Sequence, residues 1–207
     1  MWTKPIFSQQ ILFLFLISLP LLGCQQQKQE ETEVVRLDYN DLKDGWAYSN
    51  YPNGQRKSQG SYDHGEKDSE WTTWHENGQT ESRGVYVEGE PTGDWNTWYE
   101  NGQQRSSGVY SYGEKQGTWR TWHPNGQLAS QGAYDDDEAH GTWETWHPNG
   151  KLASKGTYIY GSQEGEWKRW AEDGRLLVEA EFKQGERAGI WKRHMPQNDQ
   201  VIVTAYP

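Results

Sequence analysis

Short runs of alternating polar and aromatic residues follow one another along most of this chain, and the pattern restarts at a constant interval. One unit reads TWRTWH, then PNG, then QLASQGAY between residues 118 and 134. Trp, Tyr and Thr favour strands, and a turn dipeptide such as Asn-Gly between two such runs is typical of a hairpin. The pattern therefore predicts a strand, a turn and a second strand in each unit, with no helix.

The interval is 24 residues and continues without insertion or deletion from Asn53-Gly54 to Asp173-Gly174. It predicts seven copies, the first starting near Gly45 and the last cut short at Pro207, with atypical end copies as capping of a repeat array requires. Two tryptophan ladders hold 11 of the 13 tryptophans. The first ladder is Trp71, Trp95, Trp119, Trp143, Trp167 and Trp191, the second is Trp74, Trp98, Trp122, Trp146 and Trp170, and a tyrosine ladder runs through Tyr62, Tyr86, Tyr110, Tyr134 and Tyr158 to Phe182 and Tyr206.

The turn inside each copy is predicted from the stretch HPNGQ, residues 123–127. A two-residue turn on Asn-Gly would put Pro124 where its missing N–H breaks a ladder hydrogen bond. A type I turn with Pro first, Asn second and a left-handed Gly at a bulge fits better, and it leaves His123 facing Gln127.

Counting outward from this turn pairs Trp122 with Leu128 and Trp119 with Gln131. The two tryptophans are an odd number of residues apart, so we expect them on opposite faces of the sheet. Equivalent tryptophans of successive copies are about 10 Å apart with one strand between them. That strand carries Gly132 and its equivalents, which leave room for an indole to lie flat over the backbone. Which ladder is exposed stays open.

Composition supports an aromatic core. Leu, Ile, Val and Phe number only 18 of the 183 residues after Cys24, whereas Trp and Tyr number twelve each. Large aromatic side chains bury about 150–250 Å² apiece, which holds a thin array together without two conventional layers. We therefore predict an all-β fold, an elongated antiparallel array of hairpins with about 13 strands and a length of roughly 60 Å at 4.8 Å per strand.

The start of the chain has the features of a bacterial lipoprotein signal. Lys4 precedes an apolar run from Ile11 to Gly23, which is too short to span a bilayer comfortably and ends in LLGC, a sequence that resembles the lipobox. We predict a signal peptide over residues 1–23, a lipidated Cys24 with a polar tether over 24–44, and the repeats over 45–207. Two or three acyl chains would anchor the protein stably in the cell envelope. Gln25 after the cysteine favours the outer membrane.

Charge bears on the choice of partner. The chain has a net charge of −10, and loss of residues 1–23 leaves 19 Lys and Arg against 30 Asp and Glu. Nucleic acids and anionic lipid surfaces attract the opposite sign, so we do not expect them as partners.

The unit G-x-W-x-x-W-x-x-NG-x-L-x-x-x-G-x-Y-x-x-G is clearest from Gly117 to Asp137, with Asp137 in place of the last glycine. It resembles the MORN-repeat variant family over about residues 45 to 206, and it is most similar to bacterial YwqK-like proteins labelled as antitoxins of toxin–antitoxin systems. The resemblance implies a β-hairpin array used for interaction and, in some members, neutralisation of a partner toxin. Fold transfers between such relatives more safely than function.

The sequence contains no recognisable pattern of catalytic residues, so we expect no catalytic site, no cofactor and no metal site. His75, His123 and His147 occupy one place in their copies, but Tyr99 and Ala171 replace them elsewhere, so a surface position at the strand end explains them better than a metal site. The acidic run 135–138 lacks the ligand spacing and glycine of a calcium loop, and we interpret it as a solvated turn. We do not expect this protein to be an enzyme.

Two functions remain open. The first is binding of a protein partner along the repeat surface, with a toxin as the candidate for an antitoxin or immunity factor, since an acidic binder suits a basic partner. The second is binding of cell-wall glycan by an exposed tryptophan ladder. In both cases the competing interpretation of the tryptophans is structural, because every copy has them at a fixed place.

Overall fold

The computed structural model describes residues 44–195 and 200–207, and these form 14 strands and no helix. The all-β prediction is confirmed. The strands are β1 (Gly45–Asn50), β2 (Arg56–Asp63), β3 (Glu66–Trp74), β4 (Thr80–Val87), β5 (Glu90–Trp98), β6 (Gln104–Ser111), β7 (Glu114–Trp122), β8 (Leu128–Asp135), β9 (Glu138–Trp146), β10 (Leu152–Ile159), β11 (Ser162–Trp170), β12 (Leu176–Lys183), β13 (Glu186–His194) and β14 (Val201–Tyr206).

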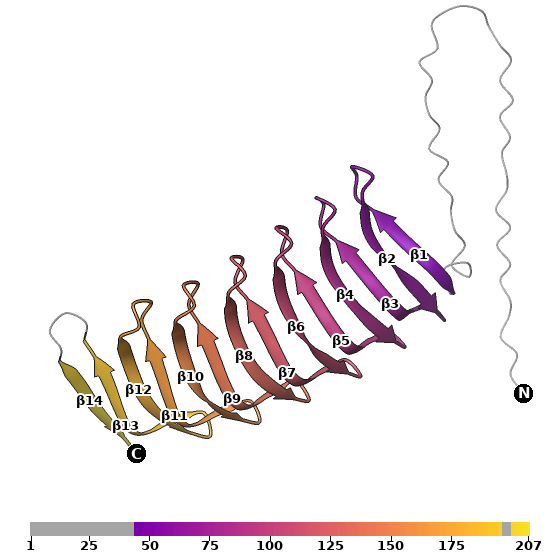
Figure 1. Ribbon diagram of the computed structural model, residues 1–207. Helices are drawn as coiled ribbons and strands as arrows, with labels where there is room; N and C mark the ends of the chain where they lie inside the picture. Colours follow the sequence, from indigo (N-terminus) through magenta and orange to yellow (C-terminus); the bar gives the residue numbers. More distant parts are fainter. Residues whose placement is uncertain (1–43, 196–199) are drawn as a thin grey trace, which may run out of the picture. The chain divides into compact units, whose positions relative to one another are not determined.

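All 14 strands belong to one open antiparallel sheet in which each strand pairs with its neighbours in the sequence (Figure 1). The predicted number of about 13 is one short, because the seventh copy also supplies its second strand, β14, although it lacks the Asn-Gly turn. None of the described residues forms a helix that would cross a membrane. The predicted signal segment, Cys24 and the tether up to residue 43 lie outside the described residues.

The turn inside each of the first six copies is the predicted one. The N–H of His123 donates to the carbonyl of Gln127 at 2.8 Å, the N–H of Gly126 donates to the carbonyl of His123 at 2.8 Å, and Gly126 has a φ of 84°. The side chain of Asn125 adds a second function. Its Oδ1 accepts from the N–H of Gln127 at 3.1 Å, and its Nδ2 donates to the carbonyl of Pro148 in the next turn at 2.7 Å. Asn therefore closes its own turn and ties it to the next copy.

The register beyond the turn differs from the prediction by one residue. Trp122 pairs with Leu128 as expected, but Trp119 pairs with Gly132 and not with Gln131. The cause is a bulge between Thr121 and Trp122, which leaves one residue of β8 without a partner and shifts the rest of the strand. As a result the first four tryptophans of the first ladder lie beside a glycine on the following strand, whereas Trp167 lies beside Ala180 and Trp191 beside Thr204.

Copies are joined by two-residue turns with both residues left-handed, such as Tyr112 and Gly113 with φ of 46° and 86°. These values are typical of type I′ turns, which match the twist of the strands on either side. The acidic run supplies one of these turns through Asp136 and Asp137, with φ of 48° and 63° and both side chains exposed. Its interpretation as a solvated turn is confirmed for these residues.

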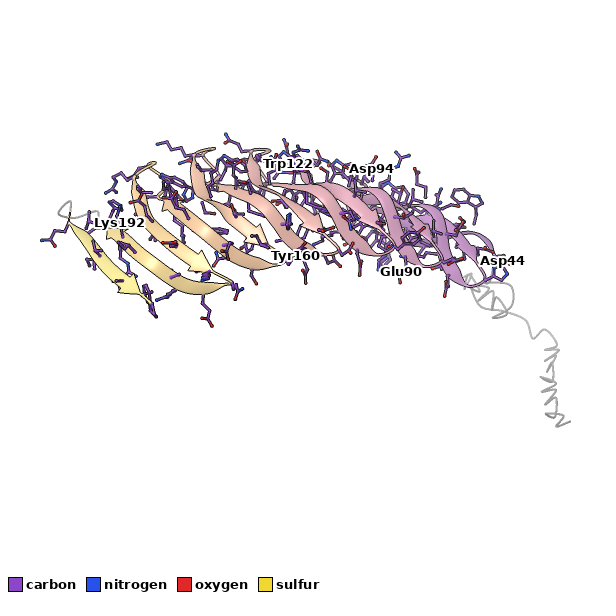
Figure 2. All side chains as sticks on the ribbon, turned by 90° about the horizontal axis from the view of Figure 1, so that it is seen from below. Asp44, Glu90, Asp94, Trp122, Tyr160 and Lys192 are labelled. Atoms are coloured by element: carbon purple, nitrogen blue, oxygen red, sulfur yellow. The ribbon has the colours of Figure 1, made fainter. Side chains whose placement is uncertain are left out.

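The sheet is a single layer with side chains on both faces (Figure 2). We call face A the face with the first tryptophan ladder, Trp71 to Trp191, and face B the face with the second, Trp74 to Trp170. A groove on face A is lined by Trp95, Trp119 and Trp143, whereas Trp74 and Trp98 line a groove on face B. The predicted placement on opposite faces is thus confirmed.

Candidate binding surfaces

Face A carries an unbroken row of aromatic rings. Each tryptophan of the first ladder lies between two rings of the tyrosine ladder, edge to face, with centroids 4.9–6.4 Å apart. Such pairs contribute about 0.5–1.5 kcal/mol each beyond the area they bury. Because consecutive rings belong to neighbouring strands, the row links every copy to the next. Sequence reasoning placed one strand between the tryptophans but did not place the tyrosines in that space.

Glycine makes this packing possible. A Cβ built on Gly132 would lie closer than 3.0 Å to the indole of Trp143, a separation that real Cβ atoms do not show. The same holds for Gly60, Gly84, Gly108 and Gly156 beneath their own tryptophans. The Trp143 Nε1–H also donates to the carbonyl of Ala133 at 3.1 Å, which satisfies the polar edge of the ring. The prediction that indoles lie flat over glycine backbone is confirmed.

A row of hydroxyl groups runs beside the rings on face A. Thr121 and Ser130 share a hydrogen bond of 2.6 Å across β7 and β8, and equivalent Thr–Ser or Ser–Ser pairs occur in four other copies. Thr97, a member of this row, is only 7% exposed. Burial raises the pKa of the nearby Tyr110 and Tyr134 hydroxyls, and the charge of Asp137 raises it further. Face A is thus a tightly packed, mostly neutral surface over most of its length.

The first ladder is therefore mainly structural, with three of its six indoles buried and Trp95, Trp143 and Trp191 half-buried. Trp71, Trp119 and Trp167 are only 5%, 8% and 9% exposed, although they belong to a one-layer sheet. Lys67 and Lys115 cover part of the rings, with Nζ 4.6 Å from the centroid of Trp71 and 5.2 Å from that of Trp119. Little of these indoles is left for a ligand to contact.

Face B presents the second ladder differently. Trp74, Trp98, Trp122, Trp146 and Trp170 are all half-buried, and none of them contacts another aromatic ring among the described residues. In several copies the residue that follows the second tryptophan, at the start of the turn, contacts the backbone carbonyl of the second tryptophan in the next copy. His75, His123 and His147 each contact the carbonyl of the second tryptophan in the next copy at 2.7–2.9 Å through Nε2, and Tyr51 and Tyr99 donate to it from their hydroxyls.

The recurrent histidines thus have a structural role that tyrosine can also fill. The remaining three histidines also have contacts of their own, that of His194 being with Glu179. His64 lies in an exposed group with Asp44 and Asp63 whose ligand atoms are within 4.8 Å of one another. These three are held together by their own contacts, since the His64 N–H donates to Asp44 at 2.6 Å and its Nδ1 lies 2.9 Å from Asp63. His140 packs against Tyr160 with ring centroids 5.3 Å apart.

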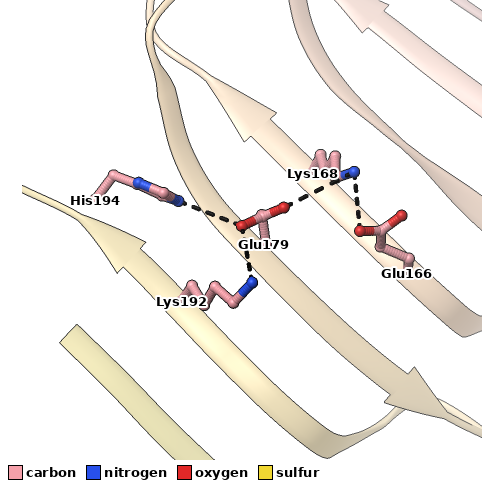
Figure 3. A network of polar contacts seen from close by, with 5 residues as sticks. All are labelled: Glu166, Lys168, Glu179, Lys192 and His194. Carbon is pink, nitrogen blue, oxygen red and sulfur yellow. Dashed lines mark hydrogen bonds and ion pairs between the residues drawn. The ribbon is translucent and has the colours of Figure 1, made fainter. Parts of the chain in front are cut away.

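Several charges on face B are paired with each other. Figure 3 shows Glu179 on β12 between Lys168 and Lys192 of the two adjacent strands, at 3.8 and 3.6 Å, with His194 at 3.4 Å. Burial raises the pKa of Glu179, but the hydrogen bond from His194 and the charges of both lysines outweigh it and hold the pKa below its usual range. The hydrogen bond to Glu166 raises the pKa of Lys168. Face B therefore offers half-exposed indoles among neutralised charges.

One groove breaks the repeat. A cavity of about 500 Å³ lies on face A across β11 to β14, and it contains Arg169, Arg187 and Arg193. The first and last of these arginines stand where earlier copies have threonine. Sequence reasoning missed them, although the loss of Thr at one place in the last two copies was a visible signal.

A model of the MORN repeat variant matches the sequence at residues 43–64, 67–88, 115–136, 139–160 and 163–184, together just over half of the chain. The chain belongs to the MORN repeat variant family. The copies of the MORN array at 91–112 and 187–206 lie outside these matches, yet they form the same paired strands, β5 with β6 and β13 with β14. A search of curated proteins found no match to this MORN protein.

Proposed function

We propose that this MORN protein is a non-catalytic envelope lipoprotein that binds a protein partner through face B. One observation carries the proposal. Every indole of the first ladder packs edge to face against the tyrosine ladder and three of the six are buried, whereas the five indoles of the second ladder are all half-buried and make no aromatic contact within the described chain. Exposed aromatic residues in a regular row are typical of binding surfaces, where tryptophan contributes most to affinity.

The dimensions of face B suit a protein. The second ladder extends from β3 to β11, which is about 40 Å at 4.8 Å per strand. A stable interface needs about 800 Å² from each partner, and a flat sheet face of this length supplies that area. Ion pairs such as Lys155–Glu144 at 2.9 Å lie beside the indoles, so the charged groups there are already neutralised within the face. Aromatic contacts are then the main source of affinity.

The protein partner is proposed to be a toxin, which this protein would neutralise as an antitoxin or immunity factor. This role rests on the resemblance to YwqK-like proteins and on the net charge of −10. An acidic protein attracts a basic partner over long range and speeds the encounter between them. We therefore expect the partner to be a basic protein.

The envelope location rests on Cys24 and the LLGC sequence before it. A diacylglyceryl group on the sulfur together with a further acyl chain would keep the protein on the membrane. In cells that make the full chain, Cys24→Ser should move the protein from the membrane fraction to the soluble fraction. Mass spectrometry of the membrane form should find the lipid on this residue. A Cys24→Ser protein that stays in the membrane fraction would contradict the anchor.

Photocrosslinking in cells tests the binding face. A photoreactive residue at Arg120, exposed beside the ladder on face B, should give one crosslinked basic protein, whereas the same residue at Arg105, exposed on face A, should not. The combined change Trp98→Ala and Trp122→Ala should abolish the crosslink from position 120 while circular dichroism stays that of a sheet. Equal crosslinking from both positions, or none from position 120, would rule out face B.

Glycan binding is the second candidate, because the half-exposed indoles recur every second strand, about 10 Å apart. A row with a constant pitch can stack on successive sugar rings of a polymer. Sedimentation with purified peptidoglycan separates the two functions. Pelleting that is lost with the same two tryptophan substitutions, and no crosslinked protein in cells, would replace the protein partner by the wall.

A further inference from the structure

The last two copies interrupt a row that is otherwise uniform across face A. From β1 to β10 the row consists of ten paired hydroxyl residues, Ser49 and Ser58 through Thr145 and Ser154. It then continues with Arg169, Val178, Arg193 and Ile202 on β11 to β14. Two guanidinium groups and two apolar side chains thus replace four hydroxyl positions. Their strands are adjacent, so the change creates one continuous surface.

This surface is the floor of the 500 Å³ groove, a volume within the usual range of ligand pockets. Thirteen described residues line the groove, and none of them is Asp or Glu. The side chains of Arg169 and Arg193 have no ion pair or hydrogen bond with any described residue. The acidic Glu179 of the same strands is on the opposite face, where lysines neutralise it. In a chain with a net charge of −10, the groove therefore keeps its positive charge unpaired.

A third guanidinium is already oriented. The Arg187 side chain stacks over Trp191 and Tyr206, 4.7 and 5.6 Å from the ring centroids, and donates from one Nη to the Tyr206 hydroxyl at 3.0 Å. Stacking holds the plane of a guanidinium while leaving its other N–H groups free for an anion. Phe182 adds a further half-buried ring to the wall. The groove combines fixed positive charge with aromatic ring faces.

We propose that this groove binds an acidic saccharide, with Arg169 and Arg193 as two anion contacts about 10 Å apart on alternate strands. Guanidinium groups pair with carboxylates in bidentate geometry. The C–H face of a pyranose ring packs on Trp191 and Phe182 as other apolar groups pack on aromatic rings.

An acidic peptide fits the groove less well. Peptides in extended form are recognised on a sheet through unpaired backbone N–H and C=O groups. β11, β12 and β13 offer none of these, because each is hydrogen-bonded to a neighbour on both sides. The outer edge of β14, the last strand of the sheet, has unpaired groups, but they point along the plane of the sheet and not into the groove above the rings. A saccharide needs only side-chain donors and ring faces. This site lies on face A, and its existence does not depend on a partner at face B.

Titration calorimetry of the full chain with an oligomer of galacturonic acid tests the proposal, with an oligoglutamate and a neutral maltose oligomer as comparison ligands. The variant Arg169→Thr with Arg193→Thr restores the residue type of the earlier copies, so it should fold. The control variant Lys155→Thr with Lys168→Thr removes the same charge from face B on β10 and β11.

The oligogalacturonate should bind the native chain and the control variant, and its affinity should fall about tenfold for each arginine removed. Binding should also weaken as salt is raised. Oligoglutamate that binds as tightly as the saccharide would replace the saccharide by an acidic peptide and overturn the proposal. It is also overturned if neither acidic ligand binds or if the arginine variant binds as well as the control variant. Loss of the face B crosslink would leave all of these results unchanged.

Discussion

Replacement of Gly132 by alanine tests the packing that joins the copies. Gly132 is buried on β8, and the indole of Trp143 lies over it so closely that a methyl group at this position would overlap the ring. The backbone of Gly132 is not left-handed, so alanine suits its conformation and the effect comes from the ring. The indole must move away, and it can do so only by changing its contacts with Tyr134 and Tyr158, now at 5.0 and 6.0 Å.

The sixth copy has alanine at the equivalent position and shows how the indole above it responds to a methyl group. Ala180 stands there in place of glycine, and Trp191 lies at 61° to both of its aromatic neighbours, Phe182 and Tyr206. In the copies with glycine the same angles are 76–90°. The Trp191 Nε1–H still donates to the carbonyl of Glu181 at 2.9 Å. A methyl group is thus accommodated by a tilt of the indole, with its hydrogen bond kept.

The cost follows from these contacts. Overpacking in a well-packed region costs about 1–3 kcal/mol, and the altered ring pairs are included in that range. Alanine also restricts the unfolded chain, which stabilises the fold by about 0.4–1 kcal/mol. We therefore expect Gly132→Ala to lower the free energy of unfolding by about 1–2 kcal/mol.

Urea unfolding followed by circular dichroism and tryptophan fluorescence measures this loss. Hydrogen exchange should locate it in β7 to β10, because a repeat array transmits a local change mainly to the adjoining copies. The control is Gln131→Ala, the preceding residue, whose half-buried side chain on face B only accepts a hydrogen bond from Arg120 and should matter by less than about 0.5 kcal/mol. Stability equal to that of the native chain in Gly132→Ala, or faster exchange spread over all strands, would refute the indole-on-glycine reasoning.

Three further outcomes are expected. Asn125→Ala should cost about 1–2 kcal/mol in urea unfolding, since it removes one bond within its turn and one to the next turn; an unchanged midpoint would show that water replaces both. Asp137→Ala should destabilise more than Asp137→Gly, because only glycine adopts the φ of 63° without strain, and thermal unfolding of the two variants compares them directly. The depressed pKa of Glu179 means that its contribution to stability is complete above a pH of about 4.3 and is lost as the pH falls through the folded-state pKa. Glu179→Gln should reduce the loss of unfolding free energy between neutral and acid pH. An unchanged loss would show that other carboxylates cause it.

The predictions that succeeded concern features that one copy encodes locally and the next repeats. The HPNGQ stretch specifies its turn because proline, asparagine and glycine each permit few backbone conformations, and the hydrogen bonds of His123 and Gly126 follow from them. The glycine beneath five indoles of the first ladder was predictable because a missing side chain at a constant interval leaves room for a large ring on the neighbouring strand. The lipidation of Cys24 and the function of face B stay predictions.

The sequence by itself determined the period, the strand content and the turns of this protein, because these depend on conformational preferences within a few residues. Only the tertiary structure decided which residues meet across strands. One unpaired residue near Trp122 moves Trp119 from Gln131 to Gly132, and a rule of strict alternation does not contain that bulge. The same register places the tyrosines between the tryptophans of the first ladder, leaves the second ladder without aromatic neighbours, and brings Arg169 and Arg193 into one groove. Each of these results depends on side chains 9 to 24 positions apart in the chain, and their proximity follows from the pairing of whole strands.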